Sequence, residues 1–412
     1  MARICVVTAG HLATCPRMTK AADALAAAGH DIRVVSTCHT RWAVAADDAM
    51  RATRSWRWRV VDYRRDAAPL PYVRSGVRSR LAQASARRLG PSRVPFAVGV
   101  HAYARVHSEL VRAAIEEPVD LFYGGTTGAL AATAEAAART GTPYGLDLED
   151  FHSEEQEGSD GALMNELAAR IETRVLPGAA FLTTSSAAIG AEYRRKYGVE
   201  PTTINNTFPL PLEPPEMAHR AGSPLRAYWF SQTIGSGRGF ERFIAGAGEA
   251  DIPMEIHLRG QSVPGYVETL RQLASSNAPR LSIVTHEPEA PDRMIALCRD
   301  YDIGLALEDG NALNKRLSLS NKALTYILAG LAVVITDTEG QRGLARELAE
   351  GALTYCGGDL RLLAEGLRLW YREPARLLAA RRAAWSAAVR RWHWEHPSQR
   401  GALIETVCGA LA

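Results

Sequence analysis

Short apolar runs alternate with Ala/Leu-rich segments along the chain. The apolar run Ile4–Val7 is followed by the Ala/Leu-rich segment Met18–Ala28 and then by a second apolar run, Ile32–Val35. Gly29 stands directly after the middle segment, where a glycine commonly ends a helix. This order predicts a strand, a helix and a second strand, and the short joints predict parallel strands with a right-handed crossover.

The same alternation continues to about residue 206 and starts again after residue 224. In the first half the pattern predicts further strands at 119–123, 144–148 and 180–185, and helices at 129–139 and 165–175. In the second half it predicts strands at 225–230, 254–258, 281–284, 303–307 and 332–336, and helices at 239–248, 294–300 and 321–329. Such alternation is typical of α/β proteins, so each half is expected to be a doubly wound α/β domain with a parallel sheet.

A proline-rich segment lies between the two halves. Prolines that can continue neither a helix nor a central strand occur at 209, 211, 214, 215 and 224. We therefore expect an N-terminal domain over 1–208, a linker over 209–224 and a C-terminal domain over 225–385. The helical, Arg/Ala-rich segment 386–412 is expected to pack back on the N-terminal domain.

Composition narrows the class of protein further. Hydrophobic residues make up 47% of the 412 residues and charged residues 23%, which is typical of a folded chain. The 48 Lys and Arg residues nearly balance the 45 Asp and Glu residues, and the formal charge of +3 argues against nucleic acid as a partner. No apolar run reaches the roughly 20 residues of a membrane span, so no integral membrane segment is expected. Six cysteines without a CxxC pair predict a cytoplasmic protein, and no cluster of metal-ligating residues is recognisable, so no metal is expected.

The loop Ser231–Gly239, between a predicted strand and a predicted helix, contains three glycines and one arginine. Glycines at 235, 237 and 239 let the backbone approach a ligand and direct N–H groups at it. The start of the following helix adds a partial positive charge and Arg238 a full one, so the loop is predicted to cradle a phosphate. The alternative is a glycine-rich turn with a solvated arginine. The loop is neither a dinucleotide-binding fingerprint, which would need glycine in place of Phe240, nor a P-loop.

A second loop, Ser318–Lys322, precedes the predicted helix 321–329. Ser320 is of the type that caps the start of a helix. Lys322 would lie in the first turn, where a cation opposes the helix dipole. This conflict is expected where an anion binds at the same helix end, and the alternative is an ordinary exposed lysine.

Carboxylates and an imidazole gather in the segment 147–155, at the end of a predicted strand. Asp150 and His152 are candidates for orienting the hydroxyl groups of a ligand or moving its proton. Glu154 and Glu155 are expected to be part of a solvated acidic loop.

The segment Arg51–Arg93 contains twelve arginines together with Trp56, Trp58, Tyr63 and Tyr72. Interleaved aromatic and cationic residues could bind a nucleic acid or a membrane surface, or could line the acceptor side of a binding cleft. The alternative is a set of solvated helix and loop faces.

Four segments carry a recognisable pattern: the run GHDIRVV that ends Pro16–Val35, YGLDLED at 144–150, NNTFP at 205–209 and NKALTYILAGLAVV at 321–334. Together they resemble the motifs of the retaining GT-B glycosyltransferases of the family 4 type, and the last segment is the most specific. The resemblance covers most of the chain. It implies two Rossmann-like domains that face a cleft, and transfer of a sugar from a nucleotide-diphosphate sugar with retention of configuration.

The sequence departs from the family pattern at several site positions. The family usually has an Arg and a Lys where this chain has Gln232 and Arg238, and two glutamates where it has Leu317 and Thr325. The usual histidine of the N-terminal domain falls on Glu149. The resemblance therefore leaves the sugar and ribose contacts open, and Lys322 is expected to replace the missing charge at the diphosphate.

The resemblance implies the following assignments. Donor-binding residues are expected to be Gly10, Ser236, Gly237, Arg238, Gly260, His286, Ser318, Leu319, Ser320, Asn321, Lys322 and Thr325. Acceptor-binding residues are expected to be His11, Thr14, Arg17, Thr126 and Thr127. Catalytic residues are expected to be Glu149, Asp150, His152, Arg238 and Lys322.

The function that these observations favour is transfer of a sugar from a UDP-, GDP- or dTDP-sugar to a small-molecule acceptor in bacterial natural-product or glycoconjugate biosynthesis. No cofactor besides the donor substrate is expected. The alternatives are a GT-B-fold nucleotide-sugar epimerase, a non-catalytic nucleotide-sugar-binding protein and, least favoured, a nucleic-acid-binding module. We expect a monomer or homodimer that can contact a membrane peripherally.

Overall fold

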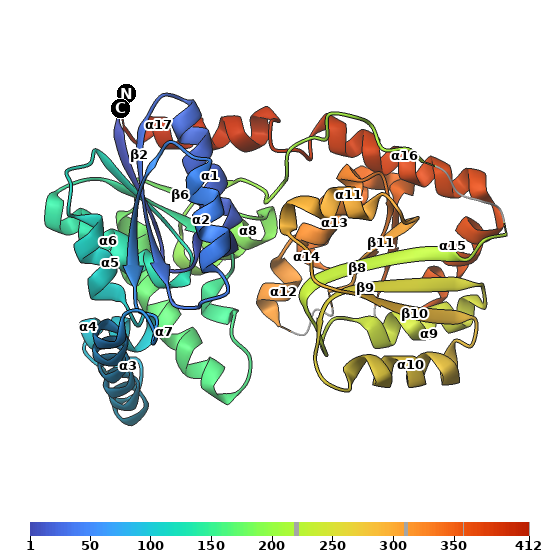
Figure 1. The fold of residues 1–412 in the computed structure, drawn as a ribbon, viewed down its shortest axis with the longest axis horizontal. Helices are drawn as coiled ribbons and strands as arrows, with labels where there is room; N and C mark the ends of the chain where they lie inside the picture. The colour runs from blue at the N-terminus through green and yellow to red at the C-terminus, as the bar shows by residue number, and fades with distance from the viewer. Residues whose placement is uncertain (218–221, 309–311, 357, 412) are drawn as a thin grey trace. The chain divides into compact units, whose positions relative to one another are not determined.

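The computed structural model describes residues 1–217, 222–308, 312–356 and 358–411. The chain forms two compact units, the first made of Met1–Asn205 with Arg400–Ala412 and the second of Asn206–Gln399. Each unit is built on one parallel sheet, here called sheet A and sheet B (Figure 1). The segment 386–412 is thus divided between the two units.

Sheet A has seven parallel strands in the order β3-β2-β1-β4-β5-β6-β7. Their bounds are β1 (Arg3–Thr8), β2 (Asp31–Cys38), β3 (Arg57–Asp62), β4 (Leu121–Gly125), β5 (Tyr144–Leu148), β6 (Phe181–Thr184) and β7 (Thr202–Thr203). Val6 of β1 lies opposite Val34 of β2 on one side and opposite Tyr123 of β4 on the other. The strand order changes direction between β1 and β4, and ligands bind at such a switch point in open α/β sheets.

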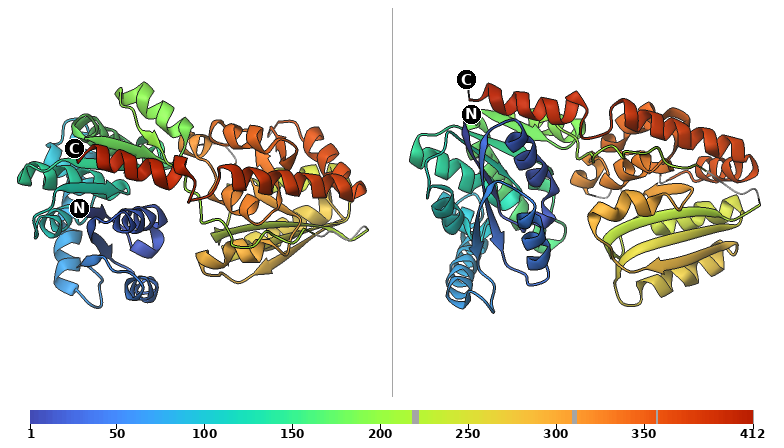
Figure 2. Two further views of the ribbon diagram at one scale, coloured as in Figure 1. Left: turned by 90° about the horizontal axis from the view of Figure 1, so that it is seen from above. Right: turned by 45° about the horizontal axis from the view of Figure 1, so that its top comes forward.

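Helices cover both faces of sheet A. They are α1 (Pro16–Ala27), α2 (Val44–Ala52), α3 (Pro69–Leu89), α4 (Phe96–Tyr103), α5 (His107–Ala114), α6 (Leu130–Thr140), α7 (Ser159–Val175), α8 (Ala187–Tyr197) and α17 (Ala402–Gly409). Leu110 of α5 and Ala132 of α6 belong to one buried cluster with Cys5 and Phe122 of the sheet. The last helix, α17, packs on α1 and β6, which brings both chain termini to one end of this unit (Figure 2).

Sheet B has six parallel strands in the order β10-β9-β8-β11-β12-β13. Their bounds are β8 (Leu225–Ile234), β9 (Met254–Ser262), β10 (Leu281–His286), β11 (Ile303–Ala306), β12 (Ala332–Thr336) and β13 (Ala352–Tyr355). The switch point lies between β8 and β11. Neighbouring residues of β8 point to opposite faces, so that Trp229 belongs to one hydrophobic cluster and Tyr228 to the other.

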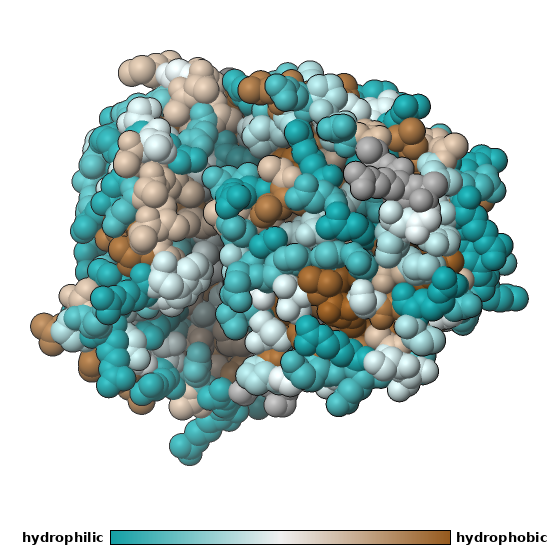
Figure 3. Space-filling model, turned by 45° about the vertical axis from the view of Figure 1, so that its right-hand side comes forward, coloured by the Kyte–Doolittle hydropathy of each residue, from teal (hydrophilic) through white to brown (hydrophobic). Residues whose placement is uncertain are grey.

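The helices of the second unit are α9 (Phe240–Ala250), α10 (Tyr266–Asn277), α11 (Met294–Cys298), α12 (Leu313–Leu317), α13 (Asn321–Leu328), α14 (Glu339–Leu348), α15 (Arg361–Arg372) and α16 (Pro374–Arg390). Helices α9, α10 and α15 pack on the face of sheet B that carries Trp229. Helices α11, α13 and α16 pack on the opposite face, with Tyr228. The surface in the view of Figure 3 is mostly hydrophilic, and its hydrophobic residues form small patches.

The alternation in the sequence predicted the fold class correctly. Several boundaries were wrong. Strands β8 and β9 continue past Phe230 and Leu258 to Ile234 and Ser262, because Thr233 and Ile234 pair with Gln261 and Ser262 after a register irregularity. Helix α7 begins at Ser159, six residues before the predicted start at 165. The strand β3 and the helix α3, both within the arginine-rich segment, had not been predicted as such. Among the described residues no helix is long and apolar enough to cross a membrane.

Candidate active site

The carboxyl end of sheet B is built around its switch point. Gly239 follows β8 as the N-cap of α9, with a φ of +78° that suits glycine. A Cβ added to Gly239 would lie only 3.0 Å from the Cβ of Leu307, the residue after β11. The glycine-rich loop therefore lies directly against the end of the neighbouring strand, and a residue with a side chain would push the two apart.

Arg238 lies at the start of α9 and is partly exposed. Its guanidinium makes no hydrogen bond or ion pair within the part of the chain that the structure describes. The preceding Gly237 also has a positive φ, of +71°, and Ser236 is exposed. A free guanidinium beside a helix start is an arrangement that can bind an anion, so the geometry fits the predicted phosphate cradle.

Lys322, in the first turn of α13, has a partner that the sequence analysis did not identify. Its Nζ lies 3.6 Å from Oε1 of Glu308, which follows β11, and it also lies over the Trp229 ring. Ser320 is at the N-cap position of α13, as predicted, but its hydroxyl donates to the same Glu308 oxygen at 3.1 Å and does not cap the helix. Lys322 is thus one half of an ion pair and not an isolated cation.

Three helices start at the carboxyl end of sheet B without a side-chain cap. The N-cap residues of α9, α13 and α14 are Gly239, Ser320 and Thr338, and none has a side chain that accepts a hydrogen bond from the first turn of its helix. The first N–H groups of a helix have no carbonyl partner within the helix. Three sets of such donors at one edge of one sheet, together with Arg238 and Lys322, make this edge electropositive.

Two other predicted donor-binding residues contribute to the sheet itself. Gly260 lies within β9, where an added Cβ would clash with the carbonyl oxygen of Ser231. His286 ends β10, and its Nε2 lies 2.9 Å from Nδ1 of the buried His257. Burial lowers the pKa of both imidazoles. Gly260 thus acts through close backbone packing, and the His286 ring is engaged with His257.

The remaining predicted donor-binding residues surround the start of α13. Ser318 donates its hydroxyl to the carbonyl of Asn314 at 2.7 Å, and Leu319 is buried. Thr325 is buried, and its hydroxyl donates to the carbonyl of Asn321 one turn earlier in the helix. Asn321 itself is exposed. The Thr325 side chain is therefore occupied within α13, which is evidence against its predicted role as a ligand contact.

At the carboxyl end of sheet A the backbone is strained at the switch point. Thr126, directly after β4, has a φ of +74°, which is rare for a β-branched residue. Its hydroxyl accepts a hydrogen bond from the backbone N–H of Ala9, which follows β1. Gly10 is part of the same loop and accepts at its carbonyl from the N–H of Thr37. Strained residues are concentrated at functional sites, so this position is a candidate ligand contact.

His152 forms a charged cluster next to this point. Its Nδ1 lies 3.0 Å from Oε2 of Glu155 and 3.2 Å from the hydroxyl of Thr127. Burial lowers the pKa of His152, but Glu155, Glu172 and Asp150 outweigh burial and raise it to about 9. The imidazole is therefore protonated at pH 7, and its buried Nε2 has no partner among the described residues. His152 can donate a hydrogen bond to a ligand, but it cannot serve as a base at neutral pH.

Glu149 has the opposite character. Burial raises the pKa of its carboxyl group to about 7. The nearby Lys20 on α1 has a pKa that burial lowers to about 7. A carboxylate with a pKa close to the working pH is suited to accept a proton, so Glu149 is the stronger base candidate of the two.

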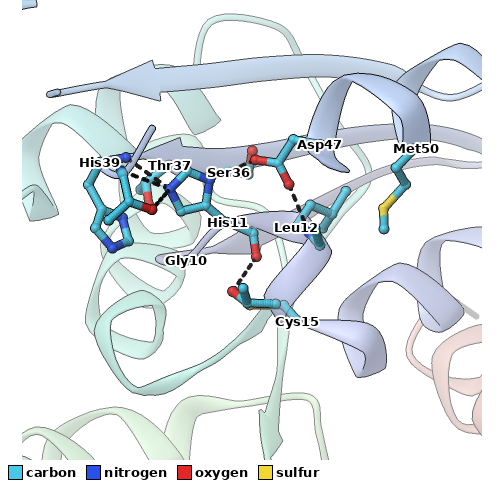
Figure 4. Close-up of polar contacts among 12 residues, drawn as sticks. Gly10, His11, Leu12, Cys15, Ser36, Thr37, His39, Asp47 and Met50 are labelled. Atoms are coloured by element: carbon cyan, nitrogen blue, oxygen red, sulfur yellow. Dashed lines mark hydrogen bonds and ion pairs between the residues drawn. The ribbon is translucent and has the colours of Figure 1, made fainter. Parts of the chain in front are cut away.

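His11 is held by the fold on both ring nitrogens (Figure 4). Its Nδ1 lies 2.8 Å from Oδ2 of Asp47, and its Nε2 accepts from the backbone N–H groups of His39 and Thr40, each at 3.1 Å. The Thr14 hydroxyl donates to the carbonyl of His11 at 2.8 Å. Because both nitrogens are occupied, His11 orders the loops after β1 and β2, and its predicted acceptor contact has no free ring nitrogen.

Arg17 lies beneath the same edge. Its guanidinium makes a bidentate pair with Asp147, at 2.8 and 2.6 Å, and donates to the carbonyl of Ile204 at 2.5 Å. Both partners of the pair are buried. Arg17 was predicted to bind the acceptor, but the structure makes it a support that ties α1 to β5.

Two functional candidates had not been identified from the sequence. Glu308 and Glu155 both orient a cationic side chain, Lys322 and His152 respectively. Glu308 could have been identified, because a carboxylate directly after a buried strand of a parallel sheet must lie at the carboxyl edge. Among the described residues no group of three or more His, Cys, Asp or Glu side chains is arranged to hold a metal ion.

Comparison with known proteins gives a consistent picture. Residues 16–206 match the model of the glycosyl transferase 4-like domain. No curated protein sequence matches the chain. One similar solved structure is Anabaena HepE (Alr3699) in complex with UDP and glucose, with a TM-score of 0.66, 15% sequence identity, and coverage of 100% of this chain and 99% of that chain. A second is sucrose-phosphate synthase from Thermosynechococcus elongatus, with a TM-score of 0.63, 15% identity and full coverage of both chains. A third is an S. aureus TarM variant in complex with fondaparinux, alpha-GlcNAc-glycerol and UDP, with a TM-score of 0.64, 8% identity and full coverage of both chains.

Proposed function

We propose that the chain is a glycosyltransferase of the GT-B type, which moves a sugar from a nucleotide-diphosphate sugar to a small-molecule acceptor with retention of configuration; the match of residues 16–206 to the glycosyl transferase 4-like domain supports the proposal. The acceptors that we propose are intermediates of bacterial natural-product or glycoconjugate biosynthesis. The retention and the acceptor class follow from the family resemblance and not from a geometric feature.

The observation that carries the proposal is the free Arg238 guanidinium at an uncapped helix start. The diphosphate of the donor binds at the carboxyl end of sheet B, between the starts of α9 and α13. Arg238 provides a bidentate contact, and the N–H groups of Gly237 and Gly239 approach the phosphate oxygens closely. Glu308 limits the charge of Lys322, so Arg238 provides the larger share of the positive charge.

The chemistry requires such an arrangement. As the bond between the sugar and the diphosphate breaks, negative charge accumulates on the leaving group. Donors that are already oriented toward this charge stabilise the transition state more than the ground state and therefore accelerate the reaction. The acceptor hydroxyl forms the new bond to the sugar and loses its proton to a carboxylate, for which Glu149 is the candidate because its pKa is about 7.

The contacts of the other polar residues at the two sheet edges suggest what each of them binds. Glu308 has a carboxylate at the carboxyl edge of sheet B and is proposed to orient a sugar hydroxyl, in place of the family glutamates that are missing at Leu317 and Thr325. On the first unit, Thr127 and the unpartnered Nε2 of His152 are proposed to bind the acceptor. Asp150 lies beside this cluster and contributes to the charge on His152.

UDP-sugars are the first donors to test, because the structure of HepE contains UDP and glucose. A thermal-shift panel of UDP-, GDP- and dTDP-sugars identifies the nucleotide, since a ligand that binds only the folded state raises its stability with concentration. Acceptors are then screened for release of nucleoside diphosphate, and the anomeric proton of the product is compared with that of the donor by NMR. Arg238→Ala should reduce the thermal shift of the best donor at the same ligand concentration.

Two outcomes would replace the proposal by an alternative. Formation of an isomeric nucleotide sugar without any acceptor would identify an epimerase. A thermal shift without release of nucleotide across the full acceptor panel would identify a non-catalytic binding protein. No shift with any nucleotide sugar would contradict the donor site itself.

A further inference from the structure

The helix α3 is packed in the reverse of the usual manner. Its buried positions carry small side chains, at Ser75, Ser79, Ala82 and Ala86, and these face α4. A helix on the surface of a globular protein normally buries its large apolar side chains and exposes its polar ones. In α3 the small residues recur every three or four positions, so the buried stripe is narrow.

The large apolar residues of α3 are exposed to solvent. Leu70, Val73, Val77 and Leu81 have 82%, 58%, 50% and 65% of their surface exposed. Their spacing of three, four and four places them on one side of the helix, opposite the buried small residues. We call these four residues the α3 apolar stripe. Four exposed aliphatic residues in a row are more than isolated surface hydrophobics and indicate an interaction site.

Arginines border the α3 apolar stripe. The helix contains five arginines and no Asp or Glu. Arg78 is paired with Glu109 of α5, whereas Arg74, Arg80 and Arg88 are exposed and make no hydrogen bond or ion pair with any described residue. Because an α-helix turns by about 100° per residue, Arg74 lies on one side of the α3 apolar stripe and Arg80 on the other.

The arginines of the preceding strand differ. Arg57 pairs with Asp31 and Glu117, and Arg59 pairs with Glu116. Arg57 and Arg59 of β3 are therefore neutralised, whereas on α3 the guanidinium groups of Arg74, Arg80 and Arg88 make no ion pair with a described residue.

A pocket of about 360 Å³ adjoins the stripe and shares Val73 and Val77 with it. Arg80 and Tyr103 also line this pocket. The neighbouring Arg105 donates to the carbonyl of Tyr72, which closes the inner wall. The pocket thus combines an apolar rim with a free cation, which suits a lipid headgroup that carries a phosphate.

We propose that this face of α3 docks on the surface of an anionic lipid bilayer. The apolar stripe enters the boundary between headgroups and acyl chains, and Arg74, Arg80 and Arg88 bind the anionic headgroups. An exposed apolar stripe with arginines at its borders is the pattern of a helix that lies in the membrane interface. Nucleic acid would not need four aliphatic residues at the contact, and a protein partner would not select for five arginines without one carboxylate.

Vesicle flotation of the full chain tests the proposal directly. The chain should float with vesicles of phosphatidylcholine and phosphatidylglycerol and remain unbound with phosphatidylcholine alone. Val77→Asp/Leu81→Asp should lower binding at least tenfold. Arg74→Gln/Arg80→Gln should lower it by roughly 25-fold, at about fivefold per lost arginine, and Arg74→Glu/Arg80→Glu should lower it further. The matched control is Leu362→Asp/Arg372→Glu on α15, which changes the same residue types at exposed positions and should leave binding unchanged.

The flotation experiment tests membrane docking independently of the proposed sugar transfer. Failure to bind anionic vesicles, or equal loss of binding in the α15 control, would overturn the docking surface whatever the enzyme activity. Binding of an RNA or DNA oligonucleotide that the α3 variants abolish, without vesicle binding, would overturn it as well. Flotation that depends on α3 in a chain that transfers no sugar would support the surface and contradict only the proposed function. All four substituted positions are exposed, so circular dichroism should show folded variants.

Discussion

The role of Arg238 can be tested by one substitution with a calculable effect. Arg238→Ala removes a guanidinium that has no partner in the described structure, so the variant should fold with a free energy of unfolding within about 0.5 kcal/mol of the wild type. If the guanidinium binds the diphosphate, the variant loses a charged hydrogen bond worth about 1.5–3 kcal/mol. This corresponds to a dissociation constant for the donor that is roughly 10- to 150-fold higher.

Isothermal titration with the preferred nucleotide sugar measures this change, and initial rates give kcat/KM alongside it. Arg238→Lys should give an intermediate loss, because lysine keeps the charge but lacks the planar fork. Arg372→Ala, an exposed arginine on α15, is the control and should bind the donor as the wild type does. Binding by Arg238→Ala within about twofold of the wild type would refute the assignment of the diphosphate to this helix start.

Four further substitutions follow from the site. Glu149→Gln should remove the rise of kcat/KM around pH 7 that deprotonation of a base with a pKa of about 7 produces, which a pH–rate profile would show. Arg17→Met should lower the free energy of unfolding by about 3–5 kcal/mol in urea denaturation, because it leaves the carboxylate of Asp147 buried without its partner. His152 has a pKa that is raised to about 9, so the protonated imidazole stabilises the folded state fully below about pH 6.5 and this stabilisation is lost as the pH rises through 9. The loss of unfolding free energy is on the order of 3 kcal/mol, and His152→Gln should not show it in a profile of stability against pH. Glu308→Gln should lower turnover at least tenfold while UDP alone binds at least as tightly as to the wild type, because Lys322 loses its ion pair; equal losses of turnover and UDP binding would contradict a contact with the sugar.

The fold could be predicted from the sequence because its signal is local. Alternating apolar runs and helix-forming segments indicate parallel α/β units without knowledge of any long-range contact. The end of β8 could not be predicted this way, since Thr233 and Ile234 are strand residues only through their partners Gln261 and Ser262. The glycine-rich loop is correspondingly shorter than its composition indicated.

The sequence indicates which polar residues gather at the sheet edges, but not which contacts they make there. Ends of parallel strands meet at one edge, so the clusters around Arg238 and His152 could be expected there. The partners that decide each role are distant in sequence: Asp47 lies 36 residues from His11, and Asp147 lies 130 residues from Arg17. Such contacts convert predicted ligand-binding residues into supports, and a single sequence does not contain them. Small residues recur at helical spacing in α3 and could have indicated its buried side, but this segment was considered only for its arginines and aromatic residues.

The proposed donor site lies at the carboxyl end of sheet B, where it would bind the diphosphate of a nucleotide sugar. Hydrogen–deuterium exchange with and without the preferred UDP-, GDP- or dTDP-sugar tests it directly, because the proposed contacts are backbone N–H groups. We expect slower exchange in peptides that cover 235–243 and 318–325, and less slowing there in Arg238→Ala at a ligand concentration near the dissociation constant of the wild type. Slower exchange elsewhere in the chain, with both of these segments unchanged under saturating ligand, would contradict it.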